Sequence, residues 1–125
     1  MNSARILLID DDDLFRKATR LTLERAGHMV VEAADGEEGL RRYREGRPDV
    51  VILDLIMPGK EGLETIRDLK AHDPAVRILA VSGGGRIDSR DYLPLAQALG
   101  AKRILDKPFT EGTLFSVLDE LLGGA

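Results

Sequence analysis

The sequence contains five short apolar segments, and four of them are followed by side chains that could take part in catalysis or metal binding. These side chains are Asp10 and Asp11 after residues 5–9, Asp54 after residues 49–53, Ser82 after residues 77–81 and Lys107 just past residues 102–105. Carboxylates gathered at one place raise one another's pKa unless a cation joins them. Mg²⁺ is a hard ion that takes one or two carboxylates together with water and phosphate oxygens. The acidic residues therefore predict a metal site.

The lysine and the hydroxyl indicate which chemistry such a metal would serve. Mg²⁺, Lys107 and Ser82 together suit the equatorial oxygens of a phosphoryl group in transfer. The remaining carboxylate, Asp54, can act as a nucleophile and form an aspartyl-phosphate. The residue types predict phosphoryl transfer, provided that the fold brings them together.

The apolar segments have the lengths of strands. They are residues 5–9, 29–33, 49–53, 77–81 and, more weakly, 102–105. The first, third and fourth are short and continuous, a pattern typical of strands buried on both faces. Such strands need helices on both sides of the sheet.

Apolar residues at helical spacing lie between and after these segments. They are Leu14, Ala18 and Leu21; Leu40 and Tyr43; Leu63, Ile66 and Leu69; Leu95, Ala96 and Leu99; and Leu114, Val117, Leu118 and Leu121. Gly27, Gly46 and Gly100 end three of these helices, and Pro74 follows another. Pro94 predicts a late or broken start to the fourth helix.

Strand and helix therefore alternate, which predicts an α/β fold with a doubly wound parallel sheet in three layers. In such a sheet, ligands bind beyond the carboxyl ends of the strands, where the reactive side chains fall. We expect Lys60 or Glu61 to begin the third helix, and we expect His28 and His72, at helix-to-strand joints, to be exposed.

Composition restricts the possible functions. A length of 125 residues fits one domain, and a net charge of -4 argues against a nucleic-acid partner. The basic run RRYR at 41–44 is typical of the exposed face of a helix. The absence of cysteine excludes thiolate catalysis and cysteine-based metal sites, and it suits the cytoplasm. No apolar run approaches the roughly 18 residues of a membrane helix. We expect a soluble cytoplasmic protein that does not insert into membranes.

Four motifs in order, ILLIDDDDLFR, DVVILDLIMPGKEGLE, ILAVSG and GAKRILDKPF, resemble the response regulator receiver family of two-component signalling. The resemblance extends from Ile6 to the last helix. It implies a single receiver domain over residues 1–125, with a flavodoxin-like five-stranded sheet of order 2-1-3-4-5. We expect no output domain, because no further pattern follows the last helix.

The resemblance also implies a role for each reactive residue. The phosphoacceptor falls on Asp54, and the metal ligands fall on Asp10, Asp11, Asp54 and the backbone carbonyl of Ile56. In the family the second acid of the pair binds Mg²⁺ directly and the first binds largely through water.

The hydroxyl and the lysine that contact the phosphoryl group fall on Ser82 and Lys107, and the bond from Lys107 to Pro108 is usually cis in the family. Two features depart from the family. Ile104 occupies a position that is often Tyr or Phe, so an aromatic switch cannot operate there. The glycine run at 83–85 predicts an unusually mobile loop.

The implied function is a signalling switch, which catalyses only its own phosphotransfer and slow dephosphorylation. Asp54 would receive a phosphoryl group from a sensor histidine kinase or a histidine phosphotransfer protein. The added charge would draw Ser82 and Lys107 inward. Affinity for a downstream protein target, which the sequence does not name, would then change on the face formed by the fourth helix, fifth strand and fifth helix.

Three alternatives remain open. An aspartate-nucleophile phosphohydrolase usually carries a second Asp two residues after the nucleophile, where this chain has Ile56, and the chain lacks a cap domain. A docking domain that works without phosphorylation would not need all five reactive positions filled. A flavodoxin-type binding module is disfavoured because two tyrosines and three phenylalanines leave little to stack on a flavin.

Overall fold

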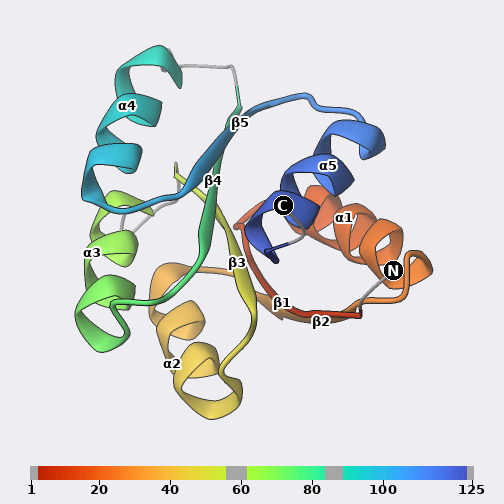
Figure 1. The fold of residues 1–125 in the computed structure, drawn as a ribbon, viewed down its shortest axis with the longest axis horizontal. Coiled ribbons are helices and arrows are strands. Elements are labelled where there is room, and N and C mark those ends of the chain that lie inside the picture. The colour runs from red at the N-terminus through yellow and green to blue at the C-terminus, as the bar shows by residue number, and fades with distance from the viewer. Residues whose placement is uncertain (1–2, 56–61, 84–88, 124–125) are drawn as a thin grey trace.

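Five strands and five helices alternate along the chain in the computed structural model, which describes residues 3–55, 62–83 and 89–123 (Figure 1). In chain order they are β1 (Arg5–Ile9), α1 (Asp13–Arg25), β2 (Met29–Ala33), α2 (Gly36–Gly46), β3 (Val50–Asp54), α3 (Gly62–His72), β4 (Ile78–Gly83), α4 (Ser89–Leu99), β5 (Arg103–Lys107) and α5 (Glu111–Leu121). The predicted alternation is confirmed, and each strand lies within two residues of its predicted bounds.

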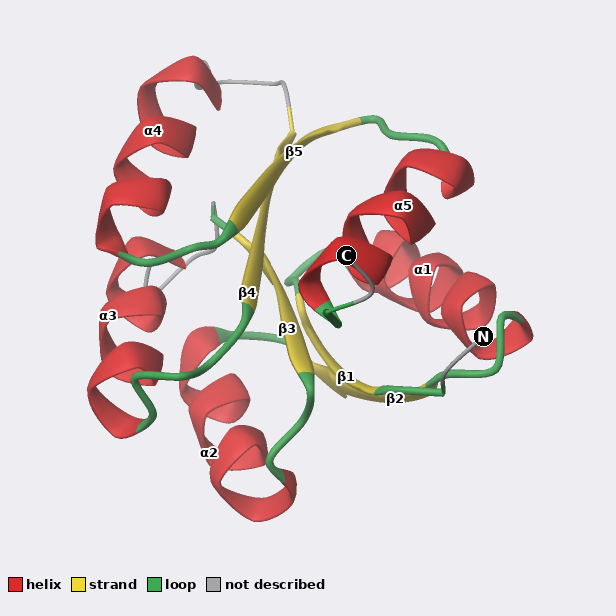
Figure 2. Ribbon diagram, viewed as in Figure 1, coloured by secondary structure: helices red, strands yellow, loops and turns green. Residues whose placement is uncertain are grey.

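The strands form one parallel sheet in the order β2-β1-β3-β4-β5, as predicted. Ile6 of β1 lies opposite Val30 on one side and Val50 on the other. Helices α1 and α5 cover one face, and α2, α3 and α4 cover the other (Figure 2). The fold is therefore the three-layer α/β arrangement that the sequence pattern predicted.

The core lies on both faces of the central strands. Every residue of β3 is buried, and β1 is buried from Ile6 onward. Because successive side chains point to opposite faces, Leu7 and Leu53 pack on the α2 side while Ile6 and Ile52 pack on the α1 side. None of the described helices has both the length and the apolar character needed to cross a membrane.

The apolar spacing that predicted α1 marks the solvent side of that helix. Leu14 is 81% exposed and Leu21 is 54% exposed. The helix instead buries Arg16, Thr19 and Leu23. The helix is confirmed, but its apolar stripe remains uncovered within the described chain.

Two further expectations are wrong. Helix α4 begins at Ser89 and contains Pro94, so its start is not late. Proline removes one intrahelical hydrogen bond, and the fully buried Ala96, two residues later, helps to hold the helix on the sheet. His28 is buried, and its Nδ1 accepts a hydrogen bond of 3.1 Å from the Ala4 N–H, which offsets the cost of burying this polar atom. His72 is exposed, as expected.

Candidate functional site

The strand ends bring the predicted reactive residues to one edge of the sheet. Asp10 directly follows β1, and Asp54 is the last residue of β3. Asp54 lies opposite Val81, the residue before Ser82. Lys107, the last residue of β5, lies opposite Gly83, the residue after Ser82. Because all the strands are parallel, these positions share the carboxyl edge of the sheet.

Three carboxylates converge at this edge. Oxygen atoms of Asp10, Asp11 and Asp54 lie within 4.8 Å of one another. Asp10 and Asp54 are buried, whereas Asp11 is exposed. Carboxylates at this separation repel, and a hard divalent cation with oxygen ligands would relieve the repulsion. The donor set therefore fits Mg²⁺. The Ile56 carbonyl, predicted as a further ligand, lies outside the described residues.

The amine of Lys107 lies between two of these acids. Its Nζ is 2.9 Å from Asp10 Oδ2 and 3.8 Å from Asp54 Oδ2. The other oxygen of Asp10, Oδ1, accepts a hydrogen bond of 2.9 Å from the Asp12 N–H. Both Asp10 oxygens thus have partners within the protein. A fixed positive charge also stands beside Asp54, where a phosphoryl group would add negative charge.

The hydroxyl of Ser82 is fully buried and has no hydrogen-bond partner among the described residues. A buried polar group without a partner costs roughly 1–3 kcal/mol. A bound group with acceptor oxygens would supply the missing bond. Ser82 therefore fits the predicted role of a phosphoryl contact.

Arg16 holds the loop that carries Asp10. Its Nη1 donates a bond of 2.7 Å to the Asp10 carbonyl, and its Nε donates a bond of 2.7 Å to Glu32 Oε1. Its Nη2 reaches Asp13 Oδ1 at 2.7 Å. Arg20 forms a second ion pair with Glu32. This network links α1, β2 and the first acidic loop.

The network shifts the pKa of two of its members. Burial opposes the charge on Arg16, but hydrogen bonds to Glu32 and Asp13 outweigh burial and raise its pKa. Burial likewise favours neutral Glu32, but the Arg16 hydrogen bond and the Arg20 charge lower the pKa of Glu32. Sequence reasoning missed both residues. The available signal was Glu32 itself, a carboxylate within the apolar segment MVVEA.

The four consecutive aspartates have separate tasks. Asp10 and Asp11 belong to the acidic cluster. Asp12 caps α1, accepting a hydrogen bond from the Phe15 N–H at 3.1 Å. Asp13 opens the helix, where a negative charge favours the helix dipole. The last two aspartates therefore serve the start of α1.

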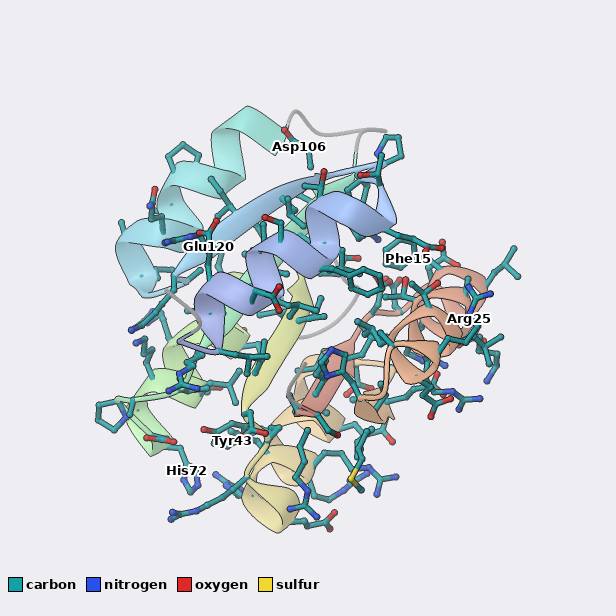
Figure 3. All side chains as sticks on the ribbon, turned by 45° about the vertical axis from the view of Figure 1, so that its right-hand side comes forward. Phe15, Arg25, Tyr43, His72, Asp106 and Glu120 are labelled. Carbon is teal, nitrogen blue, oxygen red and sulfur yellow. The ribbon has the colours of Figure 1, made fainter. Side chains whose placement is uncertain are left out.

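Two aromatic rings border the site on the α1 side. The Lys107 Nζ lies 3.8 Å above the centroid of the Phe15 ring. The Phe15 and Phe109 rings meet edge to face, with centroids 5.9 Å apart. Figure 3 shows Phe15 beside α5. The Lys107–Pro108 bond is cis, as the resemblance implied. Ile104 is half-buried and packs against the core on the other face.

Gly62 fixes how closely α3 approaches the site. A Cβ atom on Gly62 would lie 2.4 Å from the Leu55 Cα and 2.7 Å from the Asp54 carbonyl oxygen. Such separations are shorter than atoms tolerate, so only glycine fits. The predicted helix start at Lys60 or Glu61 and the glycines at 84 and 85 lie outside the described residues.

A family model described as the response regulator receiver domain matches residues 6–119. This chain belongs to the response regulator receiver family. The receiver is 32% identical to the protein CcdB of Bacillus subtilis, over 95% of this chain and 98% of that protein. It is 30% identical to the chemotaxis protein CheY of Thermotoga maritima, over 94% of this chain and 96% of that protein.

Other relatives of the receiver are longer. Over 66% of this chain it is 45% identical to the transcriptional regulatory protein AfsQ1 of Streptomyces coelicolor, but the match covers only 37% of that protein. A solved receiver domain from Clostridium thermocellum superposes with a TM-score of 0.89 and 32% identity, covering 97% of this chain and 95% of the other. Receiver domains are signalling switches, and response regulators of two-component systems interact with kinases.

Proposed function

We propose that Asp54 accepts a phosphoryl group from a phosphohistidine of a sensor histidine kinase or a histidine phosphotransfer protein. The observation that carries this proposal is the convergence of Asp10, Asp11 and Asp54 within 4.8 Å, with Lys107 beside two of them. The three carboxylates and the Ile56 carbonyl would hold Mg²⁺. The bound ion would neutralise charge on the phosphoryl oxygens.

In the transfer step, an oxygen of Asp54 attacks the phosphorus atom. The phosphorus–nitrogen bond to the donor imidazole breaks, and its electron pair stays on the ring nitrogen. Lys107 and Ser82 orient the phosphoryl oxygens, since the ammonium lies 3.8 Å from Asp54 Oδ2 and the neighbouring strand β4 carries a hydroxyl without a partner among the described residues. Asp10 keeps Lys107 in place before transfer.

The phosphoryl group carries about -1.5 to -2 charges, and it replaces the single negative charge of the Asp54 carboxylate. We expect Lys107 to move from Asp10 toward the phosphoryl group and Ser82 to bond to it. The altered surface formed by α4, β5 and α5 would then change affinity for a downstream protein. Ile104 cannot provide an aromatic rotation, so we expect the change to pass through Ser82 on β4 and Lys107 on β5.

The donor would dock on α1. The exposed apolar side chains of Leu14, Ala18 and Leu21 form a stripe on this helix, immediately after the acidic loop. Exposed apolar patches next to a reactive site are suited to protein contacts. A donor helix seated there would bring its histidine to Asp54.

Mass spectrometry after incubation with acetyl phosphate and Mg²⁺ tests the proposal. We expect one added phosphoryl group in the wild type and none in Asp54→Ala. An unchanged wild-type mass would refute it. Lys107→Ala should still accept the group but fail to change partner affinity. Steady turnover of a generic phosphate ester would instead favour a phosphohydrolase.

A further inference from the structure

Strand β2 forms an outer edge of the sheet and carries uncovered apolar side chains. Among the described strands it pairs only with β1, and Figure 1 shows it at the margin of the sheet, between α1 and α2. Met29 is 59% exposed and Val31 is 48% exposed. Exposed edge strands usually carry charged residues, proline or a covering element, because their main chain can pair with another strand. The exposed positions of β2, Met29 and Val31, carry neither a charge nor a proline.

A hollow of about 130 Å³ lies beside this edge. Most of its lining is apolar and comes from β1, β2 and the loop after α2. The lining includes Leu7, Met29, Val31 and Pro48. A cavity of about 150 Å³ accepts a benzene molecule, so this hollow can take one apolar side chain.

Two arginines are the charged residues of its lining. Arg5 donates from Nη1 to the Gly46 carbonyl at 3.2 Å, and its guanidinium has no ion pair among the described residues. Arg42 lies 3.7 Å from Glu38 and 3.7 Å from Glu45, beyond hydrogen-bond distance. Exposed ion pairs of this kind contribute little. Both guanidinium groups can therefore donate hydrogen bonds to a carboxylate of a partner.

We propose that the β2 edge binds an extended segment of a partner protein that presents an apolar side chain flanked by carboxylates. Residues two apart in a strand point to the same face. The apolar side chain would enter the hollow, and acidic residues two positions before and after it would reach Arg5 and Arg42. Main-chain bonds to β2 would supply the rest of the affinity, as in strand addition to a sheet edge. This edge lies away from Asp54, so the inference does not rest on phosphorylation.

The probe is an end-blocked fluorescent peptide of sequence Thr-Asp-Thr-Val-Thr-Asp-Thr, which places Asp, Val and Asp on one face. Fluorescence polarisation measures affinity, and amide NMR shifts locate the contact. We expect binding that perturbs Arg5, Met29 and Val31. A peptide with both Asp replaced by Lys, and one with each Asp moved by one position, should bind at least tenfold more weakly.

Variants of the protein complete the test. Val31→Lys and Arg42→Glu should each weaken binding at least tenfold. Leu21→Lys changes a side chain of similar exposure elsewhere and should bind like the wild type. Asp54→Ala should also bind normally, which separates this inference from the proposed phosphorylation. Thermal unfolding checks that each variant folds, and Val31→Thr replaces Val31→Lys if that variant does not.

Several results would overturn the inference. They are no binding by the wild type, equal binding of the lysine peptide, or unchanged binding in both the Val31 and Arg42 variants. Self-association in sedimentation that Val31→Lys abolishes would also overturn it, because the edge would then pair with a second copy of this chain.

Discussion

Single residues at this site act through several partners at once. The Arg16 guanidinium joins the Asp10 carbonyl, Glu32 and Asp13, which belong to three separate segments. Only the planar fork of arginine supplies donors in these directions, so lysine is no substitute. Arg16 is a positioning residue, because it holds the main chain of Asp10 rather than any reacting group.

Replacing Arg16 by Ala should cost about 3 kcal/mol of unfolding free energy, because the Asp10 carbonyl loses a buried hydrogen bond and the mostly buried carboxylate of Glu32 loses the arginine that is itself buried. Arg20→Ala is the matched control. The Arg20 side chain is more exposed, so we expect a loss of about 1 kcal/mol or less. Urea unfolding measures both changes. Equal losses would contradict the role assigned to Arg16.

Tyr43 provides a pH test away from the site. Its hydroxyl donates to Asp73 Oδ2 at 2.6 Å, and its ring meets His72 edge to face (Figure 3). Burial, and then the bond to Asp73, raise the pKa of Tyr43 above its usual value. This raised pKa of Tyr43 adds to the free energy of unfolding. The added stability is fully present below about pH 10 and is lost as pH rises through the folded-state pKa.

The sequence has one other tyrosine, so Tyr92→Phe leaves Tyr43 as the only phenol. We expect its ultraviolet absorbance to show ionisation well above pH 10 while the protein stays folded. Adding Asp73→Asn should lower the pKa of Tyr43, because the charged acceptor is gone. Ionisation near pH 10 in the folded single-tyrosine variant would refute the assignment.

At the scale of elements, the start of α3 packs against the end of β3, and Gly62 allows this close approach. Gly62→Ala should lower the unfolding free energy by more than about 1 kcal/mol, because the new Cβ collides with backbone atoms of Asp54 and Leu55. We also expect slower phosphorylation, since β3 must shift.

Gly112→Ala in α5 is the matched control. A Cβ there would meet only the Thr110 Oγ1, at an ordinary 3.9 Å. Within a helix, Ala is favoured over Gly by about 0.5–1 kcal/mol, so this variant should be more stable. Chemical unfolding and phosphorylation rates would measure both variants. A neutral effect of Gly62→Ala would show that the two elements can separate without cost.

At the scale of the whole molecule, alternation of strand and helix determines where the reactive residues meet. That rule is topological, which is why Asp10, Asp54 and Lys107 could be placed at one edge from the sequence. The burial of Arg16 and His28 could not be predicted, because arginine is mostly exposed in proteins and histidine has no strong preference for the core. Only the fold shows that Arg16 donates a hydrogen bond to Glu32 and that His28 accepts one from the Ala4 N–H. The sequence pattern also predicted the wrong buried face of α1, because that face carries the polar residues Arg16 and Thr19.

Metal binding should stabilise the whole molecule, because the acidic cluster joins β1 to β3. At a free Mg²⁺ concentration of about 100 times Kd, the gain is about 2.7 kcal/mol. We expect Asp11→Asn to lose most of the rise in melting temperature that Mg²⁺ causes. The same variant should be more stable than wild type in chelator, because one repelling carboxylate is gone.

Asp12→Asn is the control for this experiment, because Asn caps a helix as well as Asp does. It should keep the full response to Mg²⁺. Thermal unfolding with and without Mg²⁺ distinguishes the two variants. A full response in Asp11→Asn would place the ion elsewhere.

The ion pair between Lys107 and Asp10 joins residues 97 positions apart, and it reaches across β3 and β4 to link β5 with the start of the chain. It therefore connects two strands, β1 and β5, that share no main-chain bonds. Movement of the Lys107 amine to a phosphorylated Asp54 would break its ion pair with Asp10. Strand β5 would then lose this direct link to β1. Faster deuterium uptake along Arg103–Lys107 in the phosphorylated protein would report that loosening without any aromatic rotation.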